Sequence, residues 1–246
     1  MEISEAALRA MVRDVDDDHR SGLPTLQADI QALHAETRAY RTSRRTLLAR
    51  AGLGGASLAL AGALWPAAAR PAGAQAATTA EPDDAEIAAF AESVELAVVE
   101  AYRLAISGGK VRAAAATEAL TTFAGHHQQH AAALTTVAGL KATKRPNPSI
   151  LAKVTDQLRA ASNEKDVLRL AYGLENAAAS TYLSSIGSLD SSTALQLAAS
   201  ILPIESQHAV VLGQAAGVTG VGESGYLPTY QRTDQGVTPE DHPLSK

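Results

Sequence analysis

The sequence predicts an all-α fold: a four-helix bundle built from two similar helical hairpins. The chain is rich in alanine, aromatic residues make up only 4% of it, and runs that alternate apolar and polar residues are rare. That composition favours helices over strands. Two motifs also repeat along the chain at nearly the same distance, which indicates a duplicated structural unit.

The first repeat relates residues 127–134, HQQHAAAL, to residues 205–212, ESQHAVVL, at an offset of 78. The second is a glutamate followed seven residues later by a tyrosine. It occurs at Glu95 and again at Glu175, an offset of 80. Because both motifs recur in the same order, each hairpin should contain one Glu/Tyr helix followed by one helix with the histidine motif.

Helix start and stop signals give approximate bounds for these elements. These signals predict a linker over 77–83, the helical bundle over 84–217 and an irregular tail over 218–246. A short helix is expected in the crossover between the hairpins, after Pro148. Pro203 lies inside the last predicted helix, where it removes one backbone hydrogen bond.

The segment before the linker has two parts. Residues 1–43 are polar, with an acidic cluster at 14–18, and predict a disordered extension. Residues 44–76 begin with the pair Arg44 and Arg45 and continue into a weakly hydrophobic run rich in Gly, Ala and Leu. This part resembles a twin-arginine export signal with small-residue cleavage sites.

The export signal implies that the twin-arginine machinery is a partner and that the protein is carried across the cytoplasmic membrane. Its destination is then the periplasm, the cell envelope or the extracellular space. The alternative is an uncleaved leader that anchors the chain in the membrane, although the hydrophobic run is shorter than the ~20 residues that a span needs.

Charge and cysteine content exclude several classes of function. The net charge is −5 and the basic residues form no cluster typical of nucleic-acid binding, so no nucleic-acid partner is expected. The absence of cysteine excludes disulfides, a lipoprotein anchor and thiolate metal sites.

The segment around residues 201–212 carries the strongest chemical signal. Glu205 and His208 are three residues apart, so on a helix they share one face with apolar residues such as Ile201. A carboxylate and an imidazole are thus directed into a core, where an uncompensated charge is costly. A metal ion is the usual compensator for this pair. Glu100, by contrast, lies about 140° away from Glu95 around its helix and is expected to pair with Arg103 in solvent.

Four-helix bundles can hold two metal ions through one Glu from each of two helices and a Glu-x-x-His from each of the other two. Set against this pattern, residues 82–216 resemble ferritin-like proteins of the exported bacterial kind. The resemblance implies six metal ligands: Glu95, His127, His130, Glu175, Glu205 and His208. It also implies that Tyr102 and Tyr182 donate hydroxyl hydrogen bonds that orient ligand carboxylates. A role as radical partners or as ordinary core residues is the alternative.

The sequence departs from the family pattern at His127, where the pattern has a glutamate that bridges the two metals. A neutral imidazole cannot bridge as a carboxylate does, so Glu205 is the one obvious bridge. Three glutamates also leave one positive charge beside two divalent ions. A mononuclear site and two unequal metals are therefore alternatives to a matched dinuclear site.

Nitrogen and carboxylate ligands without sulfur suit iron or manganese, with zinc as a further candidate. The leading hypothesis is an exported metalloprotein that binds iron or manganese and reacts with oxygen or peroxide. The competing hypothesis is a non-catalytic, metal-free helical protein of the envelope or of a stress response, whose buried Glu and His residues satisfy one another. Both hypotheses, the question of catalysis and the oligomeric state stay open from the sequence alone.

Overall fold

The computed structural model describes residues 3–22, 83–218 and 234–244. Within these ranges every regular element is helical and no strand is present. After an N-terminal helix over residues 5–22, the elements follow in this order: α2 Asp84–Ser107, α3 Ala114–Ala138, the short 3-10 helix η1 Gly139–Lys141, α4 Pro148–Ala160, α5 Glu164–Ser185, η2 Ile186–Ser188 and α6 Ser192–Ala215.

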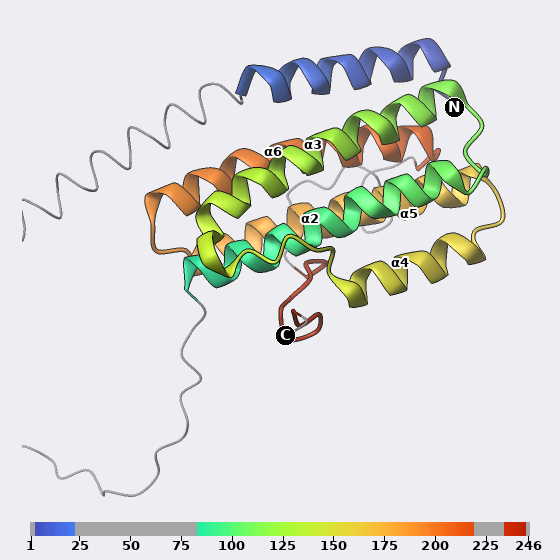
Figure 1. Cartoon of the computed structure of the whole chain (residues 1–246). Coiled ribbons are helices and arrows are strands. Elements are labelled where there is room, and N and C mark those ends of the chain that lie inside the picture. Colours follow the sequence, from blue (N-terminus) through green and yellow to red (C-terminus); the bar gives the residue numbers. More distant parts are fainter. Residues whose placement is uncertain (1–2, 23–82, 219–233, 245–246) are drawn as a thin grey trace, which may run out of the picture. The chain divides into compact units, whose positions relative to one another are not determined.

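The four long helices form a bundle of two hairpins (Figure 1). α2 packs mainly on α3, and α5 packs mainly on α6, so each helix contacts its sequence neighbour most extensively. Contacts of α3 with α6 and of α2 with α5 join the two hairpins. The connection between hairpins contains the short helix α4, which lies beside α2. The predicted all-α bundle of two hairpins with a helical crossover is confirmed.

Local signals fix the helix ends. Asp83 and Glu86 form a capping box at the start of α2, each side chain accepting from the other's backbone N–H. Asn163 caps α5 and Ser191 caps α6 in the usual way, by accepting from a backbone N–H three residues later. At the far end of α4, Lys110 Nζ donates to the carbonyls that the helix leaves unpaired, including Leu158 at 2.8 Å. The contacts of Lys110 also hold the crossover to the first hairpin.

Small side chains line the helix contacts. Ala89, Ala97, Ala101, Ala115 and Ala119 are each no more than 1% exposed. Alanine at the contact lets neighbouring helix axes approach closely, since the interaxial distance depends on the side chains between them. Larger apolar residues fill the two ends of the bundle: Leu120, Phe123 and Leu212 at one end, and Leu134, Leu197 and Ile201 at the other. A layer of polar residues lies between them.

The N-terminal helix corrects the sequence analysis. Disorder was predicted over residues 1–43, and that prediction is wrong for residues 5–22. Leu8, Val12 and Val15 lie one helical turn apart on a single face and are no more than 6% exposed, packed in the same cluster as Phe123 of α3. Burial of this stripe stabilises the helix despite its acidic residues. Residues 23–43 lie outside the described ranges.

Polar contacts on both sides of the stripe support the same docking. Arg9 Nε donates to Glu118 of α3 at 3.1 Å, and Gln207 Nε2 of α6 donates to Asp18 at 3.2 Å. The N-terminal helix therefore contacts one helix from each hairpin. The predicted export signal over 44–76, with Arg44 and Arg45, lies outside the described residues.

The described part of the C-terminal tail, residues 234–244, is irregular and packs on the bundle. Val237 N donates to Thr181 Oγ1 of α5 at 2.9 Å, and the buried Asn147 donates to the carbonyl of His242 at 2.9 Å. Of the described helices, none combines the length and the apolar character that crossing a membrane requires.

Candidate metal centre

The polar layer at the centre of the bundle contains all six residues that the sequence singled out as ligands. They come from all four long helices: Glu95 from α2, His127 and His130 from α3, Glu175 from α5, and Glu205 and His208 from α6. None of the six is more than 4% exposed. The helical spacing of each motif turns its ligand atoms inward, and hairpin packing brings the motifs to one level.

The six residues form two overlapping groups, each able to hold one cation. Glu95, His127, His130 and Glu205 make up position 1, and His127, Glu175, Glu205 and His208 make up position 2. Within each group the ligand atoms lie within 4.8 Å of one another. Because His127 and Glu205 belong to both, the two positions are adjacent.

The carboxylate of Glu205 faces both positions. Its Oε1 lies 2.8 Å from His130 Nδ1, and its Oε2 lies 3.3 Å from His208 Nδ1. One oxygen therefore faces position 1 and the other faces position 2. This is the arrangement that a carboxylate needs to bridge two metal ions.

The His127 ring spans the two positions in a different way. Its Nδ1 lies 2.6 Å from Glu95 Oε2, and its Nε2 lies 3.1 Å from Glu175 Oε1. A neutral imidazole carries one lone pair on nitrogen, so it can serve only one of the two positions at a time. His127 thus contacts residues of both positions, as a bridging glutamate would, but a neutral imidazole cannot bind two metal ions at once.

The two tyrosines cross between the hairpins. Tyr102 of α2 donates its hydroxyl hydrogen to Glu175 of α5, and Tyr182 of α5 donates to Glu95 of α2. Each tyrosine thus holds the glutamate of the opposite helix. Burial, and then the neighbouring carboxylates, raise the pKa of both phenols well above the ordinary value of 10, which keeps them as O–H donors. Such hydrogen bonds orient a carboxylate for metal binding.

Electrostatics within the layer are dominated by pairs of opposite charge. Burial alone would raise the pKa of Glu95, but the adjacent His127 outweighs burial and lowers it to about 2. Burial would lower the pKa of His130, but Glu205 and Glu95 raise it to about 9. The same opposition raises the pKa of His127 well above and lowers that of Glu175 well below the ordinary values.

Unsatisfied atoms test whether a metal fits. Among the described residues, both carboxylate oxygens of Glu205 and Nδ1 of His130 are buried and make no hydrogen bond. The 2.8 Å separation of His130 Nδ1 from Glu205 Oε1 is short, yet the two atoms are not aligned as donor and acceptor. Buried polar atoms are almost always satisfied. A cation in position 1 would satisfy His130 Nδ1 and Glu205 Oε1, and a cation in position 2 would satisfy Glu205 Oε2, so the residues present fit metal ions.

Three residues outside the predicted set adjoin the centre. His126 Nδ1 lies 2.9 Å from His208 Nε2, and His126 Nε2 lies 3.1 Å from Asp16 Oδ1 of the N-terminal helix. His19 stacks on His126 with ring centroids 3.9 Å apart. Burial, followed by the neighbouring His208, lowers the pKa of His126 to about 4, so its ring is neutral at physiological pH.

His126 directly precedes the predicted ligand His127 in the sequence, but its contacts with the N-terminal helix were not predicted. A usable signal was present in the spacing of the apolar residues Leu8, Val12 and Val15 with His19, which share one helical face.

Two other glutamates of α2 lie away from the centre. Glu92 is buried, but it accepts from the backbone N–H of Thr143 at 2.7 Å and from Thr135 Oγ1 at 2.7 Å, so it holds the loop after α3. Glu100 pairs with Arg103 at the surface, with Arg103 Nε 2.8 Å from its oxygen. Neither residue belongs to the metal positions.

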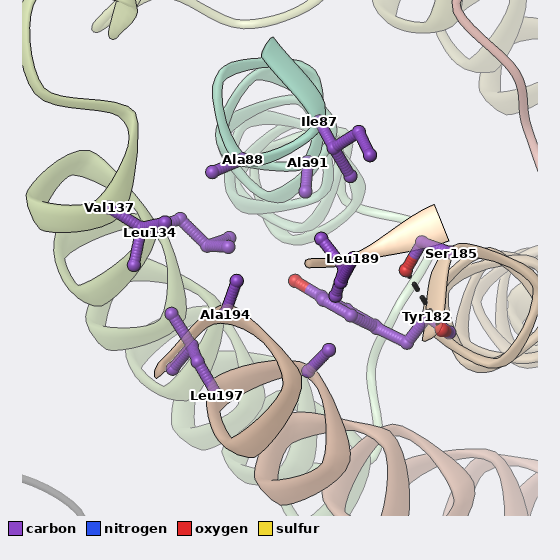
Figure 2. A pocket seen from close by; sticks show the side chains of 11 residues that line it. Ile87, Ala88, Ala91, Leu134, Val137, Tyr182, Ser185, Leu189, Ala194 and Leu197 are labelled. Atoms are coloured by element: carbon purple, nitrogen blue, oxygen red, sulfur yellow. Dashed lines mark hydrogen bonds between the residues drawn. The ribbon is translucent and has the colours of Figure 1, made fainter. Parts of the chain in front are cut away.

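A small pocket lies beyond position 1, toward the end of the bundle. Figure 2 shows its lining of apolar side chains from α2, α3 and α6, with the Tyr182 ring of α5 extending into it. Its volume of about 20 Å³ matches roughly one water-sized molecule. Tyr182 thus lines this pocket with its ring and donates its hydroxyl hydrogen to the candidate ligand Glu95.

Comparison with known proteins agrees with this geometry. A model of the ferritin-like domain family matches residues 83–218, which is more than half of the chain and covers all four ligand-bearing helices. No curated protein and no solved structure matches the chain significantly. The match and the four-helix architecture lead to one conclusion: the chain belongs to the ferritin-like domain family.

Proposed function

We propose that this protein is an exported ferritin-like metalloprotein that binds iron or manganese at two overlapping positions in the bundle core. The observation that carries the proposal is the Glu205 carboxylate, fully buried, with one oxygen toward each position and neither oxygen hydrogen-bonded among the described residues. Carboxylate and imidazole ligands without sulfur favour iron or manganese, with zinc as a weaker candidate.

The chain's own residues would divide the work at such a centre. Glu95 and His130 would hold position 1, Glu175 and His208 would hold position 2, and Glu205 would serve both. Tyr102 and Tyr182 fix the two outer glutamates, and the surrounding apolar layers exclude bulk water. A bound iron or manganese ion would supply redox chemistry with oxygen or peroxide, which none of these side chains can supply alone.

Elemental analysis of the purified full-length protein tests the proposal. We expect about one to two ions of iron or manganese per chain after growth with both metals supplied. A Glu100→Gln variant serves as the control, because Glu100 lies on α2 near Glu95 but faces solvent. It should bind as much metal as the wild type. Wild-type protein that binds neither metal, even when refolded or titrated with excess ion, would contradict the proposal.

A second candidate function rests on the charges of the same residues. The three glutamates can be balanced by three imidazolium rings, since the pKa values of His127, His130 and His208 are all raised by the adjacent carboxylates despite burial. A layer neutralised in this way would suit a metal-free helical protein of the cell envelope. The oxygens of Glu205 favour the metalloprotein instead, because they lie near imidazole nitrogens but accept no hydrogen bond among the described residues, whereas a metal-free network of ion pairs should satisfy every buried acceptor.

Export has its own test. The paired arginines are the feature that twin-arginine translocation recognises. Replacing both, Arg44→Lys with Arg45→Lys, should leave the full-length precursor in the cytoplasm, as measured by fractionation and immunoblotting. Wild-type protein should appear outside the cytoplasm, with a mature amino terminus at Gln75 or Ala77 by intact mass. Unchanged export of the double variant would overturn this part of the proposal, and an exported but uncleaved chain would favour a membrane anchor.

A further inference from the structure

The N-terminal helix reaches the metal centre through a line of hydrogen bonds. Asp16 of this helix contacts His126, and His126 contacts His208, which is a ligand of position 2. His208 in turn places its Nδ1 3.4 Å from Glu175 Oε2 and 3.3 Å from Glu205 Oε2. The line of hydrogen bonds therefore runs from the helix over residues 5–22 to the Glu175 carboxylate of position 2, with the Glu205 carboxylate close by.

The chemistry of the three side chains fixes where the hydrogens lie. A carboxylate can only accept, so the hydrogen between Asp16 and His126 belongs to His126 Nε2. In a neutral His126 ring, Nδ1 then has a lone pair and accepts from His208 Nε2. His208 consequently carries a hydrogen on Nε2. Without a metal ion its Nδ1 also carries a hydrogen, directed at the carboxylates of Glu175 and Glu205. A metal ion in position 2 would displace that hydrogen and would bind the lone pair of Nδ1.

We propose that Asp16 and His126 are positioning residues of the metal centre, which set the tautomer and the orientation of the ligand His208. This inference rests on the proposed metal function. Metal-ligating histidines usually donate their second ring N–H to a carboxylate, a carbonyl or water. Here the acceptor is another imidazole, backed by a carboxylate from a helix outside the bundle.

Packing around His126 supports a positioning role. His126 is 2% exposed. The His19 ring stacks on it, and the Phe123 ring also packs against it, with the centroids of Phe123 and His126 5.9 Å apart. His19 is itself 4% exposed. Arg20 holds the other oxygen of Asp16 at 2.7 Å, which fixes the direction of the carboxylate. Aromatic contacts and an ion pair thus hold both residues in the geometry that the hydrogen bonds require.

Cleavage of the predicted export signal would separate Asp16 from the metal centre. Asp16 precedes the predicted export signal, and cleavage after Ala74 or Ala76 would leave it on a separate chain from His126. The centre would then have its full set of hydrogen bonds in the uncleaved chain, before transport. We therefore expect the uncleaved chain to bind metal more tightly than the exported, cleaved chain.

Substitutions in the full-length chain test the inference, with Mn(II) as the probe. Affinity is measured by titration, following free Mn(II) by electron paramagnetic resonance. His126→Phe keeps an aromatic ring but removes both nitrogens, and Asp16→Ala removes the terminal acceptor. Each should weaken Mn(II) binding about 10–100-fold, the usual effect of losing such a partner. Asp16→Asn retains an acceptor oxygen and should restore most of the affinity lost in Asp16→Ala.

Asp17→Asn is the matched control, since Asp17 is exposed on the same helix and the substitution makes the same change in charge. It should bind Mn(II) like the wild type. A second measurement separates positioning from folding: nitrogen NMR of the Zn(II)-loaded protein should show His208 protonated at Nε2 in the wild type, and a mixture of states in Asp16→Ala.

The outcomes distinguish this inference from the function beneath it. If the wild type binds no metal, both fall. If the wild type binds Mn(II) but His126→Phe and Asp16→Ala, folded by circular dichroism, bind it with unchanged affinity, this inference alone is overturned. If Asp17→Asn weakens binding as much as Asp16→Ala, the effect is one of general charge, and the positioning role is likewise overturned.

Discussion

The two hairpins of the bundle are close copies in their framework and differ in their candidate metal ligands. In α2 and α5 the match is complete, because each helix supplies one glutamate and one tyrosine that reaches the glutamate of the other. Of the two candidate ligands that α3 and α6 each supply, only the last is the same residue type in both helices: His130 in α3 and His208 in α6. At the preceding ligand, α3 has His127 where α6 has Glu205.

This difference shows which properties of the centre belong to the fold and which belong to single residues. The fold sets the level and the direction of the ligands, because the repeat places both motifs in the same layer. The residue type at the position shared by His127 and Glu205 decides the charge of the centre and whether the side chain can bridge two metal ions. Glu205 has one oxygen for each metal position, whereas His127 holds Glu95 and Glu175 through its two ring nitrogens.

A neighbouring pair of matched positions differs as well. His126 in α3 corresponds to Ile204 in α6, at the same offset of 78. His126 connects His208 to the N-terminal helix, while a hydrocarbon side chain at Ile204 can make no such hydrogen bond. The hairpins thus diverge at two adjacent positions, and both changes place imidazole in α3.

Removing the carboxylate that we propose bridges the two positions should have the largest effect. Glu205→Gln keeps the shape of the side chain but removes its charge from both positions. We expect metal affinity to fall by more than about 100-fold, beyond the range for losing an outer hydrogen-bond partner. Titration with Mn(II) measures this, with Glu100→Gln as the control of equal chemistry. Full retention of metal in Glu205→Gln would mean that the two positions do not depend on a common carboxylate.

Making the hairpins alike should change the number of metal ions bound. His127→Glu supplies a second carboxylate at the bridging level and balances the charge of two divalent ions. We expect stoichiometry to rise toward about two ions per chain where the wild type binds fewer, with faster oxygen-dependent oxidation of Fe(II). Melting temperature in excess metal should rise too, since only the folded state binds the ions.

The metal-free alternative predicts the reverse for His127→Glu. A fourth buried carboxylate beside Glu95, Glu175 and Glu205 would add like-charge repulsion and a desolvation cost. Elemental analysis and melting curves in chelator and in Fe(II) or Mn(II) separate the two outcomes. A variant that gains no metal and melts lower under every condition would count against the metal centre.

Tyrosine substitutions should have smaller and matching effects, because the crossing hydrogen bonds are equivalent in the two hairpins. Tyr102→Phe releases Glu175 of position 2, and Tyr182→Phe releases Glu95 of position 1. Each should weaken metal binding by about tenfold. Mn(II) titration of both variants provides the comparison. An effect from only one of them would show that a single position is occupied.

The smallest expected effect is a pH dependence of the metal-free protein. The pKa of His130 rises from 6.5 to about 9 on folding, so its contribution to stability is complete below pH 6.5 and is lost as the pH rises through 9. The pKa of Glu95 falls from 4.5 to about 2, so its contribution is present above pH 4.5 and is lost as the pH falls through 2. Burial and neighbouring histidines lower the pKa of His126 to about 4 and that of His19 to about 3, so stability also falls as the pH drops below 6.5, where the unfolded chain binds more protons. In chelator, melting temperature should therefore be highest near pH 6.5 and lower by pH 9.

Bound metal should reverse the alkaline part of this profile. Histidine ligands must be deprotonated to bind a metal, so affinity increases with pH. The gain in melting temperature on adding Mn(II) should thus be larger at pH 8 than at pH 6. An equal gain at both values would indicate that the added metal does not bind through these histidines.

The sequence predicted the bundle well because the signals for it are local. Caps, glycine stops and inward stripes repeat within a few residues, and the duplication fixes the order of the helices. The same spacing brought all six candidate ligands to one layer, where the structure places them in two overlapping groups. Glu100 also lies at the surface with Arg103, in agreement with its phase on α2.

Contacts between distant segments could not be predicted in this way. The pairing of each tyrosine with the glutamate of the opposite helix depends on how α2 and α5 face one another. The contact between Asp16 and His126 joins residues 110 positions apart. Its helix was missed because the acidic residues 14–18 outweighed a short apolar stripe, whose stabilisation comes from packing on the bundle rather than from its own propensity.

The most direct test of the account is to locate the metal ions in a crystal of the full-length protein soaked in Mn(II) or Fe(II), by anomalous scattering. We predict peaks only in the polar layer of the bundle: one beside Glu205 Oε1 and His130, and, where two ions bind, a second beside Glu205 Oε2 and His208. The carboxylate of Glu205 should contact every ion present. A core without any anomalous peak at saturating metal, or ions bound only at the surface, would contradict the account.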